Sequence, residues 1–246
     1  FVELLKPDFL VLENVSGMKS TANGSFVREI EERIKIAGEK NGKRYHVEHR
    51  ILNAADFGVP QIRKRLIFLA SARDYPIVWP EPEFGTPDRP YRTVFDAIGD
   101  LPPLQPGEKK HFYTTPPQTE YQKMMRDGSD ILLNHEAPKH PQSTIERIRE
   151  TKPGEPMYPR FRQRIRLAWD KPSPTQVAGG IRPQFQFGHP RDPRGLTVRE
   201  RARIQSFPDW YQFFGGIVQG RVQTGNAVPP LLAKAIAEKI KEVINA

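Results

Sequence analysis

Cysteine is absent from this chain of 246 residues. The chain therefore forms no disulfide, offers no thiolate ligand to zinc and holds no cysteine nucleophile of its own. Apolar runs are also short. None approaches the roughly 18 residues that a membrane-spanning helix needs, and no secretory leader is visible. We therefore expect a soluble, cytoplasmic protein without contact to a membrane, and no residue pattern indicates a metal site.

The charge of the chain is strongly positive. Lys and Arg number 38 against 29 Asp and Glu, which gives a formal net charge of +9. Such an excess indicates a polyanionic partner, although it says nothing about the fold. The 25 prolines are about twice the usual share. The hydrophobic content of 37% is too high for a wholly disordered chain.

The first 72 residues have the pattern of an α/β fold. Residues 8–15 contain four consecutive apolar residues between polar ones, which predicts a strand buried on both faces, as in a parallel sheet. An apolar face at helical spacing predicts a helix from Ser25 to about Ala37, ended by Gly38. Two further strands are expected at 45–52 and 66–70.

Residues 73–195 hold most of the prolines and only one convincing helix, at 142–150. We expect an irregular, mostly β second domain. Within it, arginines alternate along 160–166, which would place them on one face of a strand. This face could simply be solvated, or it could bind phosphates, which would relieve the mutual repulsion of the arginines.

The chain closes with an amphipathic helix. Pro229 and Pro230 suit its first turn, and an apolar stripe at a spacing of three to four residues follows, comprising Leu232, Ile236, Ile240 and Val243. The stripe must be buried, and the N-terminal segment offers the only α/β sheet. We therefore predict one domain from residues 1–72 and 225–246, with a second domain of residues 73–224 inserted between them.

Four short segments carry chemical groups in a specific order. They are Glu13-Asn14-Val15, Gln61-Ile62-Arg63-Lys64-Arg65, an amphipathic helix over 199–209, and the glycine turn Gly225–Pro230. Each is weak alone, and the helix is best interpreted as structural. Together they resemble the C-terminal portion of DNA (cytosine-5) methyltransferases of the bacterial restriction-modification type. Pro174–Gly180 is also similar to the loop that closes the recognition region of that family.

The chain departs from that family in two places. It contains neither the Phe-x-Gly-x-Gly loop for S-adenosylmethionine nor the Pro-Cys loop with the nucleophile. We therefore expect this chain to be inactive alone. The resemblance implies part of a Rossmann-like, S-adenosylmethionine-dependent methyltransferase domain joined to a target-recognition domain.

The resemblance also implies roles for individual residues in methyl transfer to C5 of a flipped cytosine. Glu13 would hydrogen-bond N3 and the exocyclic amine as a protonated acid, and Arg65 would donate to O2. Arg63, counted with the catalytic residues, and Gln61 would support the reaction by positioning the catalytic loop or a nearby phosphate. Asn14 would orient the loop that follows it.

Double-stranded DNA is the partner that the resemblance implies. The residues expected to contact it are Gln61, Arg160, Arg162, Arg164, Thr175, Gly179 and Gly180. Asn226 and Val228 would form one wall of the S-adenosylmethionine site. The DNA sequence that is recognised cannot be predicted, because it is read by loops.

Three other functions fit the same residues. The chain could be a non-catalytic DNA-binding module, or one subunit of a split methyltransferase completed by a partner that carries the cysteine. It could also belong to an enzyme that methylates RNA, as one branch of the family does. The addition of an N-terminal half would distinguish the first two by restoring, or failing to restore, methyl transfer.

Overall fold

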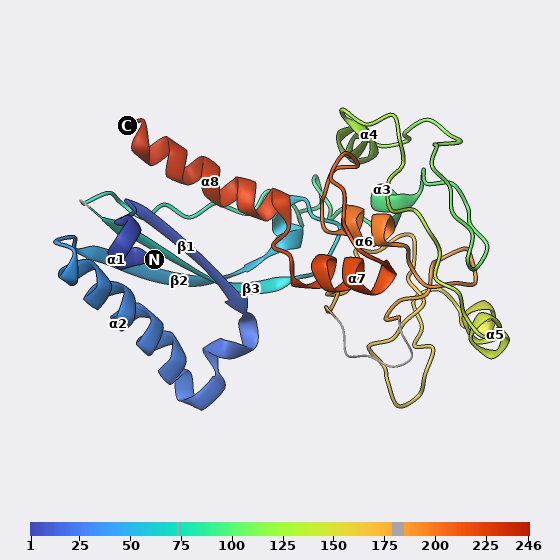
Figure 1. The fold of residues 1–246 in the computed structure, drawn as a ribbon, viewed down its shortest axis with the longest axis horizontal. Helices are drawn as coiled ribbons and strands as arrows, with labels where there is room; N and C mark the ends of the chain where they lie inside the picture. The colour runs from blue at the N-terminus through green and yellow to red at the C-terminus, as the bar shows by residue number, and fades with distance from the viewer. Residues whose placement is uncertain (73, 179–184) are drawn as a thin grey trace.

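The computed structural model describes residues 1–72, 74–178 and 185–246, which form two lobes side by side (Figure 1). One lobe is a three-stranded sheet with helices on both faces. The other is a larger, irregular lobe that contains the short helices α3 to α7. The two ends of the chain both lie in the sheet lobe.

The sheet has the strand order β1-β3-β2, with β1 at Phe9–Val15, β2 at Tyr45–Asn53 and β3 at Lys64–Ala72. Both pairings are antiparallel, so the expectation of parallel strands is wrong for the described residues. β1 is also not buried on both faces, because it is an edge strand whose residues are half-buried or exposed. The central strand β3 is buried along most of its length instead.

Helices cover both faces of β3. On one face, Phe68 packs in a cluster with Val27 of α2 (Ser25–Lys40). On the other face, Ile67 packs in a cluster with Leu232 of α8 (Pro230–Ile244). A strand covered on both sides has no polar face, which is why residues 66–70 of β3 are continuously apolar. The apolar stripe of α8 therefore packs against the sheet, as its pattern requires.

Helix α2 is longer than predicted and runs through Gly38 to Lys40. Gly38 does not end the helix. A Cβ atom at this position would lie 2.4 Å from the ring of Tyr45 and 2.6 Å from the carbonyl oxygen of Lys43. Glycine is therefore required by close packing against β2 and not by a turn.

The irregular lobe contains fewer strands than predicted. After β3, the described residues form only isolated β-bridges, such as that between Pro156 and Ile165, and no regular β-strand. The helices of this lobe are α3 (Val94–Ile98), α4 (Glu120–Arg126), α5 (Gln142–Glu150), α6 (Val198–Ile204) and α7 (Ile217–Asn226). α5 confirms the helix predicted at 142–150, whereas α7 was not predicted.

The core of this lobe surrounds helices α3, α4 and α6. Its buried members include Ile98, Tyr121, Phe187 and Ile204.

The sheet lobe has four further short elements, which are helix α1 (Val2–Leu5) and the 3-10 turns η1 (Ser16–Lys19), η2 (Thr21–Gly24) and η3 (Ala54–Phe57). The η3 turn contributes Ala54 and Phe57 to the cluster under α8.

Candidate active site

Glu13 and Arg65 meet on adjacent strands. Glu13 lies near the end of β1 and Arg65 near the start of β3. The antiparallel register pairs Val15 with Arg65 and so brings these two strand ends together. The Nε atom of Arg65 lies 2.7 Å from Oε1 of Glu13, and the two side chains are 11% and 22% exposed. The structure therefore brings together the two residues that the sequence analysis places at the cytosine ring.

Both partners keep part of their surface at the edge of the sheet. Burial lowers the pKa of the Arg65 guanidinium, while the carboxylate of Glu13 acts in the opposite direction. Asn14 lies beside them and accepts a hydrogen bond of 2.8 Å from the backbone N–H of Val15. This bond fixes the local course of the chain where β1 passes into η1.

Arg63 is buried and does not face the pair. Arg63 is 1% exposed. Its guanidinium donates to three backbone carbonyls, those of Gln176 at 2.9 Å, Gly225 at 2.8 Å and Ala227 at 3.0 Å. Burial and the nearby charge of Arg65 lower the pKa of Arg63 to about 10. Because its guanidinium is enclosed by protein, Arg63 is not placed to touch a substrate directly, and its supportive role in catalysis stays a prediction.

Gln61 and Thr175 are also turned inward. Gln61 is fully buried, and its Oε1 accepts from the backbone N–H of Gln176 at 3.3 Å. The hydroxyl of Thr175 donates to the carbonyl of Ile62 at 2.7 Å. The burial of Gln61 contradicts the prediction that it contacts DNA directly. The hydroxyl of Thr175, also predicted to contact DNA, already donates to a backbone carbonyl. Both residues join two distant segments of the chain.

These contacts fasten residues 173–177 beside residues 60–63. Most of these residues belong to the loop that the resemblance assigns to the recognition region, and the name recognition segment for 173–177 refers to that expectation. The backbone N–H of Ile62 donates to the carbonyl of Ser173 at 2.8 Å, and Ser173 donates to Pro60 at 3.0 Å. Gln186, which the sequence analysis did not identify, bonds the backbone of the recognition segment twice. No local pattern marks Gln186. The predicted DNA contacts Gly179 and Gly180 lie outside the described residues.

The arginines of 160–166 do not share one face. Arg160 and Arg162 are exposed, whereas Arg164 is buried, with its guanidinium 4.5 Å from the ring centre of Phe161. The segment turns instead of forming a strand, since the N–H of Arg164 donates to the carbonyl of Phe161. The prediction that Arg164 contacts DNA is therefore wrong, while Arg160 and Arg162 remain accessible to a phosphate backbone.

The helix predicted at 199–209 is structural, as expected. It forms as α6, which ends at Ile204 and is shorter than predicted, starts with a reciprocal capping box between Thr197 and Glu200, and is buried throughout. Arg203 is fully buried and pairs with Asp100 at 2.6 Å and with Asp209 at 2.5 Å. Their negative charges raise the pKa of Arg203. Such residues hold the irregular lobe together from inside.

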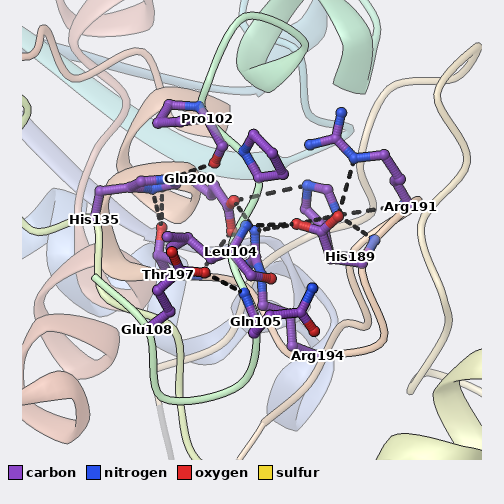
Figure 2. A network of polar contacts seen from close by, with 12 residues as sticks. Pro102, Leu104, Gln105, Glu108, His135, His189, Arg191, Arg194, Thr197 and Glu200 are labelled. Carbon is purple, nitrogen blue, oxygen red and sulfur yellow. Dashed lines mark hydrogen bonds and ion pairs between the residues drawn. The ribbon is translucent and has the colours of Figure 1, made fainter. Parts of the chain in front are cut away.

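A second buried network surrounds Glu200 (Figure 2). Its carboxylate accepts from both terminal nitrogens of Arg194, at 2.8 and 2.9 Å, and Arg194 also reaches Asp192 at 2.9 Å. His189 lies against them, and its Nδ1 accepts from the backbone N–H of Arg191 and of Asp192. Its proton therefore belongs on Nε2, which lies 3.7 Å from Glu200. Burial lowers the pKa of His189 to about 3.

Asn226 and Val228 lie where α7 ends and α8 is about to begin. Asn226 is exposed and Val228 is half-buried, so both can be reached by a ligand. The sequence pattern predicts a glycine turn at this junction, but Gly225 lies within α7. A Cβ atom on Gly225 would lie 2.3 Å from the Cα atom of Ala178, which shows that the helix is packed directly against the backbone beside the recognition segment.

Comparison with known proteins identifies the family. The model of the C-5 cytosine-specific DNA methylase family matches residues 1–242. The chain belongs to this family. It is 37% identical over 249 residues to the type II methyltransferase M1.HphI of Haemophilus parahaemolyticus, and 36% identical over 277 residues to M.DdeI of Desulfomicrobium norvegicum. These alignments cover 97% and 98% of the chain but only 58% and 64% of the relatives.

Solved structures share the fold. An E. coli prophage protein described as a DNA modification methyltransferase superposes with a TM-score of 0.76 at 23% identity, over the whole chain and 72% of that protein. The Dnmt2 methyltransferase of S. pombe gives a TM-score of 0.51 at 15% identity, over 98% of the chain and 68% of that protein. Among the described residues, no helix is long and apolar enough to cross a membrane.

Proposed function

We propose that this chain is the target-binding and cytosine-orienting part of a DNA (cytosine-5) methyltransferase of the restriction-modification type. The observation that carries the proposal is the ion pair of Glu13 and Arg65 at the end of the sheet. Its substrate would be a cytosine flipped out of duplex DNA. Such a substrate would place the enzyme in the bacterial cytoplasm, on the DNA.

The pair suits the charge that develops during the reaction. Attack of a thiolate at C6 of cytosine drives negative charge toward N3 and O2, and donors placed at those atoms lower the barrier. The contact between the two side chains uses Oε1 of Glu13 and Nε of Arg65. In the complex with cytosine we expect Glu13 to be protonated, as the family resemblance implies, so that its Oε2 donates to N3, while Nη2 of Arg65 donates to O2.

The sequence contains no cysteine, so the thiolate must come from residues outside it. The chain spans about three fifths of the two relatives named above, which leaves room in such proteins for a nucleophile and a cofactor loop. The three antiparallel strands would then be part of a larger Rossmann-like sheet. A separate subunit that carries the cysteine would satisfy the same chemistry.

S-adenosylmethionine, when bound, would supply the methyl group. The exposed amide of Asn226 and the half-buried side chain of Val228 fit one wall of such a site, with a polar and an apolar part. In this scheme residues 1–72 and 225–246 belong to the catalytic domain. Residues 73–224 form the target-recognition domain, whose exposed Arg160 and Arg162 would bind phosphates.

The substitution Glu13→Gln in the complete enzyme tests the proposal. Glutamine keeps the shape of the side chain but cannot pass a proton to N3, so turnover should fall by about 100-fold or more. Binding of a duplex, measured by fluorescence anisotropy, should change by less than about threefold, because phosphate contacts dominate affinity. Glu29→Gln, an exposed carboxylate paired with Arg33, is the matched control.

The outcomes separate the alternatives. Unchanged methyl transfer by Glu13→Gln would remove Glu13 from the chemistry. If this chain and a cysteine-bearing half together bind duplex DNA but never methylate it, the chain is a binding module. Methylation of transfer RNA in preference to duplex DNA would place it in the RNA branch.

A further inference from the structure

Helix α7 ends against a side chain from another part of the fold. The last carbonyls of a helix have no partner within the helix and carry the negative end of its dipole. α7 has no basic residue in its last turn. Arg63, 162 residues earlier, donates through Nη2 to the carbonyl of Gly225, and the same nitrogen reaches the carbonyl of Ala227. Gln205 donates to the carbonyl of Thr224.

The same guanidinium also holds the recognition segment. Its other terminal nitrogen, Nη1, donates to the carbonyl of Gln176 at 2.9 Å. One buried cation therefore joins three parts of the chain: the segment that leads into β3, the recognition segment and the α7–α8 junction. Arg65 follows Arg63 by two residues along the chain.

The recognition segment and the α7–α8 junction do not depend equally on Arg63. The recognition segment has other anchors, since Arg201 donates to the carbonyl of Val177 and Gln186 bonds Thr175 and Val177. The carbonyls of Gly225 and Ala227 lie directly around the exposed Asn226, and Arg63 bonds both of them. Gln205 and Arg201 still hold Thr224, one residue before this point. Removal of Arg63 should therefore free the two carbonyls that flank Asn226, while the recognition segment keeps its other bonds.

Only arginine suits this position. Its planar guanidinium presents several N–H donors in a fixed fork, whereas lysine carries a single ammonium on a flexible stem. Lysine can keep the charge but cannot hold the three carbonyls in the observed geometry. Backbone packing adds to the constraint, because Gly225 would place a Cβ atom within 2.5 Å of backbone atoms of Val177 and Ala178.

We propose that Arg63 is a positioning residue that caps α7 and holds the wall formed by Asn226 and Val228 against the recognition segment. This inference rests on the proposed function, because it gives that wall the role of contacting S-adenosylmethionine. It assigns Arg63 to the geometry of the cofactor site, although the guanidinium touches no substrate. Arg65, two residues later, acts at the base.

The test compares Arg63→Lys with wild type in the complete enzyme, and uses S-adenosylhomocysteine as the probe. Calorimetry should show about tenfold weaker binding of the probe, the effect of losing one hydrogen bond to a charged group. The KM for S-adenosylmethionine should rise by a similar factor while kcat falls by less than about threefold, because loss of binding that is uniform through the reaction affects KM alone. Arg33→Lys, an exposed arginine on α2, is the control.

A second variant approaches the same contact from the other side. Gly225→Ala leaves Arg63 in place but forces the α7 terminus away from the backbone of Ala178. It should weaken binding of the probe in the same direction. Circular dichroism establishes that each variant is folded before its binding is compared.

Two results would overturn the inference. One is a folded Arg63→Lys enzyme that binds the probe within twofold of wild type. The other, if Arg63→Lys does not fold, is a Gly225→Ala enzyme with unchanged binding. Failure of the wild-type enzyme to bind the probe or to methylate DNA would instead reject the proposed function, so the two failures are distinguishable.

Discussion

The buried carboxylate of Glu200 gives a prediction about stability that follows directly from its contacts. It accepts two hydrogen bonds from Arg194 and one of 2.8 Å from the backbone N–H of Thr197, and it is fully buried. Glu200→Gln keeps the volume but removes the negative charge. Arg194 then retains only Asp192 as a carboxylate partner, at 2.9 Å.

The magnitude follows from the loss of one partner of a buried ion pair. Such a loss costs about 3–5 kcal/mol of unfolding free energy, because the remaining charge is left in a medium that solvates it poorly. Since Asp192 still compensates part of the charge on Arg194, we expect the lower end, about 3 kcal/mol. Total stabilities are about 5–15 kcal/mol, so the effect is a large fraction of the whole.

Thermal unfolding followed by circular dichroism at pH 7 measures this effect. For a chain of this size, about 3 kcal/mol corresponds to a fall in Tm of roughly 6–12 °C. The control is Glu238→Gln on α8, whose carboxylate lies 3.6 Å from Lys234 with both side chains largely exposed. It should cost less than about 1 kcal/mol. If both variants shift Tm equally, the buried network does not stabilise the lobe and the reasoning is refuted.

Two further predictions concern pH and DNA. The pKa of His189 is held near 3 by burial, so between about pH 6.5 and 3 this residue takes up its proton only in the unfolded state. The contribution of His189 to the free energy of unfolding is therefore present above about pH 6.5 and is lost below it by about 1.4 kcal/mol per pH unit. The Tm of His189→Gln should accordingly depend less on pH than the Tm of the wild type. Replacement of both Arg160 and Arg162 by Ala in the complete enzyme should weaken duplex binding and lower the slope of log K against log salt by about 2, whereas Arg164→Ala should mainly lower Tm. An unchanged slope in anisotropy titrations would show that Arg160 and Arg162 face solvent only.

Local elements were predictable where an apolar pattern is strong. The continuous run of β3, the stripe of α8 and the helix at α5 all appear at or near the predicted residues. α7 was missed because its buried positions are Gly220, Thr224 and Gly225, small residues that leave no apolar periodicity. Antiparallel pairing was missed because strand direction depends on connections and neighbours, and an apolar run does not encode it.

The site was predictable as a set of residues but not as a set of roles. Arg63 and Arg65 are two residues apart, as are Arg162 and Arg164, and in each pair one arginine is buried. The spacing does not show which one. Nothing near Arg63 in the sequence shows that its acceptors are the carbonyls of residues 176, 225 and 227. For Arg63, segments more than 100 residues away provide the enclosure, whereas Arg164 packs against the nearby rings of Tyr158 and Phe161.

The sequence by itself determined the family, the order of the chemical groups and the absence of a cysteine nucleophile, because these depend only on which residues are present and how they are spaced. The tertiary structure alone decided which polar groups are exposed and which are enclosed by protein. Desolvation and hydrogen-bond partners come from contacts between distant segments. For that reason Glu13 and Arg65 form a pair at the end of two adjacent strands, while Arg63 and Gln61 lie inside the protein.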